Sequence, residues 1–261
     1  MKKSRAAFYK QLKQEKCQAL VNPVIKDLVS EQRAQMPRLG GKKLYSLVKE
    51  SMQDHRIYMG RDKFFNWLKA NEMLVPRKKR FARTTQSNHR FRVHKNLIKG
   101  LEIKYPDQCW VSDITYLRLQ KGYCYLALIT DAFSRKIIGY DISQSLELNG
   151  CMRAARMACR GRKMNKTIHH SDRGIQYCSG PYTAYLSSNR IKISMGEAGN
   201  CYENAMAERV NGILKSEFNL DATFVSLEQA AKAAKQAIKT YNTKRPHMSI
   251  HMKIPSELYA A

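Results

Sequence analysis

The chain has 261 residues, of which 43% are apolar, as expected for a globular protein with a buried core. Its 47 Lys and Arg residues against 21 Asp and Glu give a net charge of +26, which repels itself unless a polyanion relieves it. These numbers exclude a disordered tail and indicate a nucleic-acid partner.

The bulk sequence also limits the location and the metal chemistry of the protein. No apolar run approaches the roughly 18 residues that a membrane-spanning helix needs, so we expect no membrane partner and a cytoplasmic, nucleoid-associated location. The seven cysteines are scattered and include no Cys-x-x-Cys pair, which argues against a disulfide framework and a zinc knuckle.

Residues 1–75 have the pattern of a helical, helix-turn-helix-like DNA-binding segment. The stretch "VNPVIKDLVSEQ" predicts a helix that starts at an Asn22 cap with Pro23 in its first turn, and "KKLYSLVKESM" predicts the next helix. The stretch "RDKFFNWLKANEML" predicts a helix capped by Asp62, whose Lys63 and Lys69 would contact DNA in the major groove. A plain helical core piece is the alternative.

Residues 76–105 have the composition of a basic linker. Nine basic residues and no acid lie between positions 77 and 99, with little periodicity. A segment of this charge stays extended and neutralises phosphates on DNA. Arg77, Lys78, Lys79 and Arg80 are therefore expected to bind DNA.

Residues 106–222 predict a mixed α/β sheet. Strands are expected at 108–119, 122–134 and 135–143 with short connections, then a helix from about 146 to 160. A strand at 166–172, a helix near 181–188, a strand at 191–196 and a helix from about 202 to 218 follow. Residues 223–261 add a helix, with Ser226 and Gln229 as its capping box, and an extended tail.

Three carboxylates of this region form a candidate site. Asp113 lies within the first strand among apolar residues, where a charge is costly without a partner, and Asp172 ends the fourth strand. Glu208 follows Asp172 by 36 positions, on a predicted helix. Taken singly, each has an ordinary structural explanation; taken together, they can share a divalent metal ion.

The sequence around these carboxylates resembles a known family. "WVSDITY", "HHSDRGIQY", "GNCYENAMAERVNGILKSEF" and "YNTKRPHMSIHMKIPSEL" are similar, in this order, to motifs of the insertion-sequence-three (IS3-type) transposases, over roughly residues 106–258. The front segment is similar to the helix-turn-helix of the downstream reading-frame product in that family. Tyr202 and Glu203 stand where the family usually has Trp and Asp, so neither is given a catalytic role.

The resemblance implies a ribonuclease H-like, integrase-type core whose Asp113, Asp172 and Glu208 are both the catalytic residues and the metal ligands. Mg²⁺ or Mn²⁺, as two ions, would serve cleavage of element ends by water and then attack of the resulting 3′-hydroxyl on another strand. Lys215, two helical turns after Glu208, is expected to contact the element end. Lys244 and Arg245 match a family motif and are expected to contact DNA or to pack against the core.

Two other functions and several partners stay open at this level. A nuclease of the same fold that cuts without joining would share the carboxylates, and a DNA-binding regulator could carry an inactive core. DNA, as terminal inverted repeats and target, is the expected partner of a homo-multimer on paired ends. Proteins of this family are often made from two overlapping reading frames that are joined by frameshifting. The upstream-frame product, or the frameshift fusion with it, is therefore a further expected partner.

Overall fold

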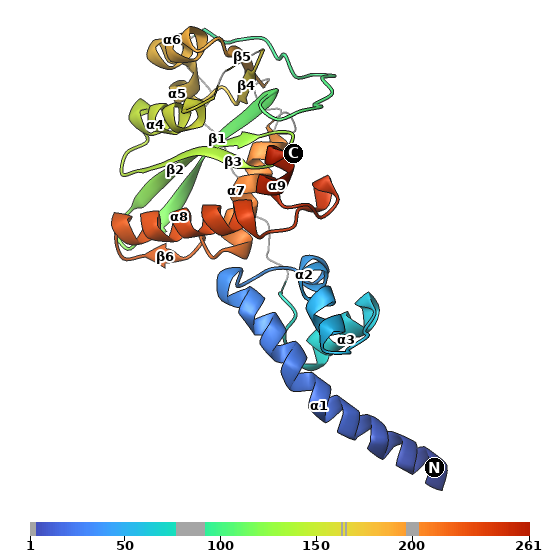
Figure 1. Ribbon diagram of the computed structural model, residues 1–261. Helices are drawn as coiled ribbons and strands as arrows, with labels where there is room; N and C mark the ends of the chain where they lie inside the picture. Colours follow the sequence, from blue (N-terminus) through green and yellow to red (C-terminus); the bar gives the residue numbers. More distant parts are fainter. Residues whose placement is uncertain (1–3, 77–91, 163, 165, 197–203) are drawn as a thin grey trace. The chain divides into compact units, whose positions relative to one another are not determined.

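The computed structural model describes residues 4–76, 92–162, 164, 166–196 and 204–261 (Figure 1). The chain divides into two compact units, Met1–Arg77 and Lys78–Ala261, and each is described by itself. None of the described helices is both long enough and apolar enough to cross a membrane.

The first unit is helical, with α1 at Arg5–Gln35, α2 at Gly41–Asp54 and α3 at Arg61–Ala70 (Figure 1). Its core has the helical spacing that the sequence predicted. The buried apolar side chains are Ile25, Val29, Met36, Leu39, Leu44, Val48, Met52, Ile57, Phe64, Trp67 and Leu68. The second and third predicted helices are therefore present, and Trp67 is a core residue as expected.

Two predicted helix caps in this unit are wrong. Pro23 lies inside α1, and the Asn22 side chain, instead of capping a helix, accepts a 2.8 Å hydrogen bond from the Trp67 indole. This contact with α3 and the apolar face that follows outweigh the cost of a proline in a helix interior. Gly60 is the N-cap of α3; Asp62 lies in its first turn, where its negative charge still favours the helix dipole.

The second unit is a mixed sheet in the order β3-β2-β1-β4-β5. The strands β1 (Cys109–Leu119), β2 (Tyr123–Asp131) and β3 (Ile137–Ser143) are antiparallel neighbours, as predicted. The strands β4 (Ile168–Ser171) and β5 (Lys192–Met195) run parallel to β1. The two-residue β6 (Thr223–Phe224), which the sequence did not predict, pairs with the far end of β1.

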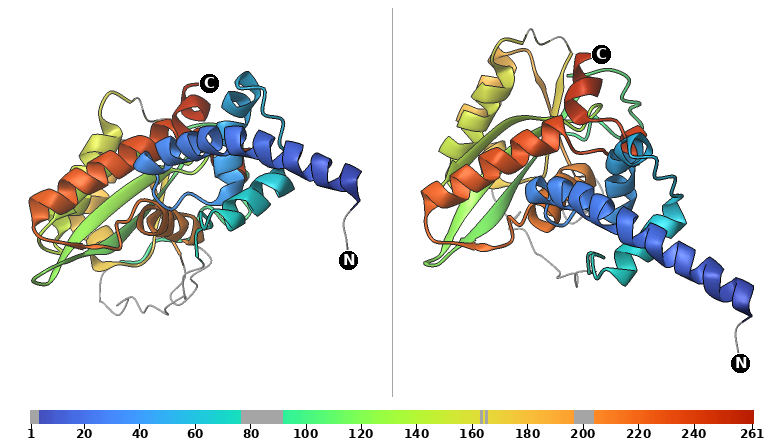
Figure 2. Two further views of the ribbon diagram at one scale, coloured as in Figure 1. Left: turned by 90° about the horizontal axis from the view of Figure 1, so that it is seen from below. Right: turned by 60° about the horizontal axis from the view of Figure 1, so that its bottom comes forward.

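Helices cover both faces of this sheet (Figures 1 and 2). Trp110 packs in a core with α4 (Leu148–Cys159), α5 (Ile175–Cys178) and α6 (Gly180–Ser188). Its neighbour Val111 packs with Ala207 of α7 (Ala205–Glu217), because successive strand residues face opposite sides. The helix α8 (Leu227–Thr243) also packs on the sheet.

The described end of the predicted linker is attached to the core. The Leu97 amide donates to the Ser194 hydroxyl of β5 at 2.8 Å, and Ile98 packs beside Val111. This part of the basic segment therefore does not behave as a free, extended chain. Side-chain partners on β5, which composition does not reveal, account for the difference.

The tail after α8 is folded rather than extended. Ser226 caps α8 as predicted by accepting from the Gln229 amide, although the Gln229 side chain accepts from Val225. A 3₁₀ turn at Met248–Ile250 and the helix α9 (Pro255–Ala260) follow. The Tyr259 hydroxyl donates to the Asp107 carboxylate at 2.6 Å, which fixes α9 beside the start of β1.

Candidate active site

The parallel pairing of β1 with β4 brings Asp113 and Asp172 together. Ser112 pairs with Ser171, so the two aspartates follow at the same level of neighbouring strands. Both side chains are half-buried. The aspartate in "HHSDRG" directly follows the short strand β4, which runs parallel to β1. Asp172 therefore lies beside a second carboxylate, that of Asp113, and does more than form a turn.

The Asp113 carboxyl is strongly perturbed by this arrangement. Burial, and then the charge of Asp172, raise the pKa of Asp113 to about 7, and Glu208 adds to the rise. A hydrogen bond from Asn211 acts in the opposite direction. The three carboxylates therefore repel one another, and a cation between them would relieve the repulsion.

Glu208 lies in the first turn of α7. Two buried asparagines, one at the N-cap of α7 and one within it, hold this helix against β1. The Asn211 amide donates to Asp113 Oδ2 at 2.7 Å, and the Asn204 amide donates to the Ser112 carbonyl at 3.1 Å. Asn211 was not among the site residues expected from the sequence. Its signal was the spacing of three from Glu208, which places both side chains on one helix face.

The three carboxylates are the right type of ligand for a divalent metal ion, but their side chains are too far apart to bind one together. Carboxylate oxygens are the ligands that Mg²⁺ and Mn²⁺ prefer, and the charges of Asp172 and Glu208 both contribute, after burial, to the raised pKa of Asp113. Within the described ranges, however, no three potential ligands converge closely enough to hold one ion. The carboxylates would therefore have to move closer together to share it.

His169, on the strand that precedes Asp172, links β4 to β1 and to α6 by hydrogen bonds. His169 is fully buried, and its Nε2 lies 2.7 Å from the Ser112 hydroxyl and 3.0 Å from the Tyr182 hydroxyl. Burial, with a smaller effect of His170, lowers the pKa of His169 to about 3, so this ring is neutral. It braces the strand that carries Asp113 and is not placed as a metal ligand.

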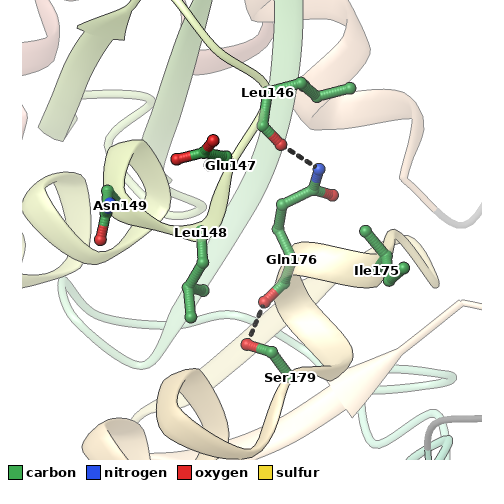
Figure 3. Close-up of a pocket in the computed structure, with 7 residues that line it drawn as sticks. All are labelled: Leu146, Glu147, Leu148, Asn149, Ile175, Gln176 and Ser179. Atoms are coloured by element: carbon green, nitrogen blue, oxygen red, sulfur yellow. Dashed lines mark hydrogen bonds between the residues drawn. The ribbon is translucent and has the colours of Figure 1, made fainter.

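A pocket opens beside Asp172 between the start of α4 and α5 (Figure 3). Its lining combines apolar and polar side chains: Leu146, Glu147, Leu148, Asn149, Ile175, Gln176 and Ser179. The Gln176 amide donates to the Leu146 carbonyl at 2.6 Å and joins the two walls (Figure 3). A Cβ on Gly174 would lie 3.0 Å from Asp172 Oδ1 and 3.5 Å from Gln176 Oε1, so the pocket adjoins the carboxylates.

The expected DNA-contacting lysines lie at several surfaces. Lys63 and Lys69 are exposed on α3, and Lys244 is exposed at the end of α8. Lys215 is half-buried on α7. Arg77, Lys78, Lys79 and Arg80 lie outside the described residues, as do Tyr202 and Glu203.

Arg245 packs against the core, which is the second of the two roles expected for it, and it is not exposed for the first, a contact with DNA. Its side chain is 2% exposed, and its guanidinium binds the Glu217 carboxylate through Nε at 2.8 Å and Nη2 at 3.0 Å. It also lies 5.5 Å from the centre of the Tyr241 ring. The planar guanidinium binds both oxygens of the carboxylate, and because it is buried it is not exposed to a DNA phosphate.

The fold of the second unit is that of an integrase core. Two models of the family described as "Integrase core domain" match residues 104–201 and 189–255. A chain of the simian T-cell lymphotropic virus intasome, solved in complex with PP2A regulatory subunit B56 gamma, has a similar fold. Its TM-score is 0.52 at 18% identity over 85% of this chain and 75% of that one, which confirms the ribonuclease H-like architecture.

The curated relatives are proteins of bacterial insertion sequences. The 31 kDa protein of insertion element IS600 from Shigella sonnei is 34% identical over 205 residues, 77% of this chain and 75% of that protein. Transposase InsF of IS3A from Escherichia coli K12 is 36% identical over 58% of this chain, which spans 53% of InsF. The chain belongs to the IS3 family of transposases with an integrase-type core.

Replacing Asn211 with Ala is expected to lower the rate of DNA cleavage by about 10- to 100-fold, because its amide orients the Asp113 carboxylate. The loss of its hydrogen bond also raises the pKa of Asp113 further. The pH profile of cleavage should therefore shift to higher pH, which a purely structural defect would not cause. An Asn189→Ala control, at the end of α6, should leave the profile in place; a profile unmoved in Asn211→Ala would contradict the assignment.

Proposed function

We propose that Asp113, Asp172 and Glu208 bind divalent metal and catalyse cleavage and strand transfer at the ends of an insertion sequence. The observation that carries the proposal is the pairing of Asp113 with Asp172 on adjacent strands, with α7 held to the same strand by Asn204 and Asn211. Glu208 would be the third ligand, and its position on the same α7 face as Asn211 supports this role.

The side chains of this site have separate tasks. When bound, two Mg²⁺ or Mn²⁺ ions would activate the attacking oxygen and stabilise the leaving oxygen of the phosphodiester. Asp113 and Asp172 would supply ligand oxygens from the sheet, and Asn211 keeps Asp113 oriented through its 2.7 Å hydrogen bond. Lys215, two turns after Glu208, would meet the phosphate backbone of the bound end.

The same pocket would serve two successive reactions. Water is the first nucleophile and frees a 3′-hydroxyl at the element end, and that hydroxyl then attacks a phosphodiester of the target DNA. Phosphoryl transfer of this kind needs positioning and charge stabilisation, without a covalent enzyme intermediate. The helix-turn-helix of α2 and α3 would supply the recognition of the ends that a general nuclease does not need.

The assembly that acts would be a homo-multimer on paired ends, made of this chain or of its frameshift fusion with the upstream-frame product. An exchange between two DNA ends requires two bound duplexes at once, which supports a multimer. The large excess of Lys and Arg, +26 overall, supports binding to long stretches of DNA.

The direct test is a cleavage and joining assay with the purified chain, a labelled duplex carrying the terminal repeat, an unlabelled target and Mg²⁺ or Mn²⁺. The proposal predicts nicked repeat ends and larger, joined products. Cleavage without any joined product would indicate the nuclease instead. Specific binding without cleavage, in the chain and in its frameshift fusion, would indicate the inactive regulator.

Metal binding to this site should depend on pH through Asp113. Because burial raises the folded pKa of Asp113 from 3.8 to about 7, the stability of the metal-free protein falls as pH rises from about 4 to about 7 and then levels off. Mn²⁺ offsets this cost, so the melting temperature gained on adding Mn²⁺ should be small at pH 5.5 and larger at pH 8.5. Each kcal/mol corresponds to about 2–4 °C for a domain of this size.

The matched control for this titration is Asp113→Asn, which keeps the shape of the side chain. The variant should lose most of the Mn²⁺-induced gain at pH 8.5. It should also lack the part of the fall in metal-free stability between about pH 4 and pH 7 that comes from Asp113. An equal gain at both pH values, or an unchanged gain in the variant, would contradict a metal site that includes Asp113.

A further inference from the structure

The turn between α2 and α3 presents one aromatic side chain to solvent. Tyr58 is 79% exposed, more than Tyr9, Tyr105 or Tyr123, which are 57%, 49% and 50% exposed. A tyrosine ring left in water forgoes the stabilisation that its burial would give. Its exposure therefore calls for an explanation in terms of the fold or of a partner.

The fold fixes the turn on both sides of Tyr58. The preceding Ile57 is buried, and its amide donates to the Met52 carbonyl at 2.8 Å. The carbonyl of the following Met59 accepts a 2.9 Å hydrogen bond from the Tyr45 hydroxyl. The Tyr45 ring packs against Phe64 of α3, with 5.5 Å between the ring centres.

These contacts hold the backbone on both sides of Tyr58, so the residue is not part of a loose loop. In an extended stretch, consecutive side chains point in opposite directions, so the burial of Ile57 directs Tyr58 outward. A rigid aromatic side chain loses little conformational entropy on binding a partner. The turn is thus built to display a ring.

The surroundings of Tyr58 favour an anionic partner. Arg56, Arg61 and Lys63 are exposed within five residues of it. Two acids, Asp54 and Asp62, lie four residues from Tyr58 on either side, and Asp62 already accepts a 2.9 Å hydrogen bond from Arg61. An open hollow lined by residues 60–63 begins two positions after the ring.

We infer that Tyr58 contacts DNA: its ring packs on sugar and base surfaces of the terminal repeat, while Arg56 and Lys63 meet the phosphates. The inference rests on the proposed function, because it takes the duplex bound by α2 and α3 to be the element end. Phosphate contacts carry affinity that salt weakens, whereas a ring packed on base surfaces carries sequence-dependent affinity that salt hardly changes.

The test compares binding of the full chain to two duplexes of equal length, one with the terminal repeat and one with its bases scrambled, at several salt concentrations. Tyr58→Ala should weaken binding to the repeat by about tenfold or more and to the scrambled duplex by less than about threefold. The slope of log affinity against log salt should stay unchanged. Tyr58→Phe should bind like the native chain.

Two further variants serve as matched controls. Lys63→Gln should weaken binding to both duplexes and reduce the salt slope by about one, as the loss of a phosphate contact does. Tyr105→Ala, which removes an exposed ring from the other unit, should leave both affinities unchanged. Melting temperatures of all variants verify that they fold, and an exposed ring such as Tyr58 should not change the value.

The outcomes separate this inference from the function on which it rests. Native-like binding of Tyr58→Ala to both duplexes, or an equal loss on both, would overturn the role of the ring. A native chain that binds the repeat no better than the scrambled duplex would overturn the recognition of ends itself, and Tyr58 with it.

Discussion

Asp172→Asn is expected to reduce DNA cleavage and strand transfer by about 10³-fold or more, which corresponds to about 4 kcal/mol of activation free energy. The substitution keeps the shape of the side chain and removes one negative ligand from beside Asp113. Asp113→Asn and Glu208→Gln should have effects of the same size. The measurement is the single-turnover rate on a labelled repeat in Mg²⁺, at saturating protein.

Binding to DNA should survive these substitutions, because phosphate contacts come from basic side chains elsewhere. Removal of negative charge should even strengthen binding slightly. Glu102→Gln is the control, since Glu102 is an exposed carboxylate paired with Lys104. Full cleavage by Asp172→Asn, or an equal loss in Glu102→Gln, would contradict the catalytic assignment.

Arg245→Ala is expected to lower the free energy of unfolding by about 3–5 kcal/mol, the usual cost of leaving one partner of a buried ion pair alone. Glu217 would remain almost fully buried without the guanidinium that now binds both of its oxygens. The end of α7 would lose its link to the segment after α8. Urea denaturation followed by circular dichroism measures the change.

A matched pair distinguishes burial from charge as the cause. Arg153→Ala removes an exposed arginine that binds Asp141, and it should cost only about 0–1 kcal/mol. Arg245→Met together with Glu217→Leu should recover much of the stability lost in Arg245→Ala, because no charge stays buried. A loss below about 1 kcal/mol in Arg245→Ala, with a reduced salt slope of DNA binding, would restore Arg245 as a DNA contact.

The elements with strong local patterns were predictable from the sequence. The three antiparallel strands were confirmed because β-branched and aromatic runs alternate with short turns there. The predicted caps at Asn22 and Asp62 were wrong because a cap depends on which residue and which hydrogen-bond partner take the position in the folded chain. The Asn22 side chain accepts a hydrogen bond from Trp67 of α3 and does not cap a helix. The helix α3 begins at Arg61, so its N-cap is Gly60 and not Asp62.

The candidate site was predictable in its residues but not in its supporting contacts. Order and spacing singled out Asp113, Asp172 and Glu208, and the pairing of β1 with β4 brings the first two together. The family motif that contains Arg245 left both DNA contact and packing against the core open, because a motif does not show which basic side chain is buried. Asn211 escaped notice because a neutral amide carries no charge signal.

The measurement that tests the account most directly is a crystal structure of the protein soaked in Mn²⁺, with anomalous diffraction recorded to locate the ions. The account predicts anomalous density bounded by Asp113, Asp172 and Glu208, and its loss in Asp172→Asn. Anomalous density that appears only elsewhere, or that persists unchanged in Asp172→Asn, would contradict a catalytic metal site formed by these three carboxylates.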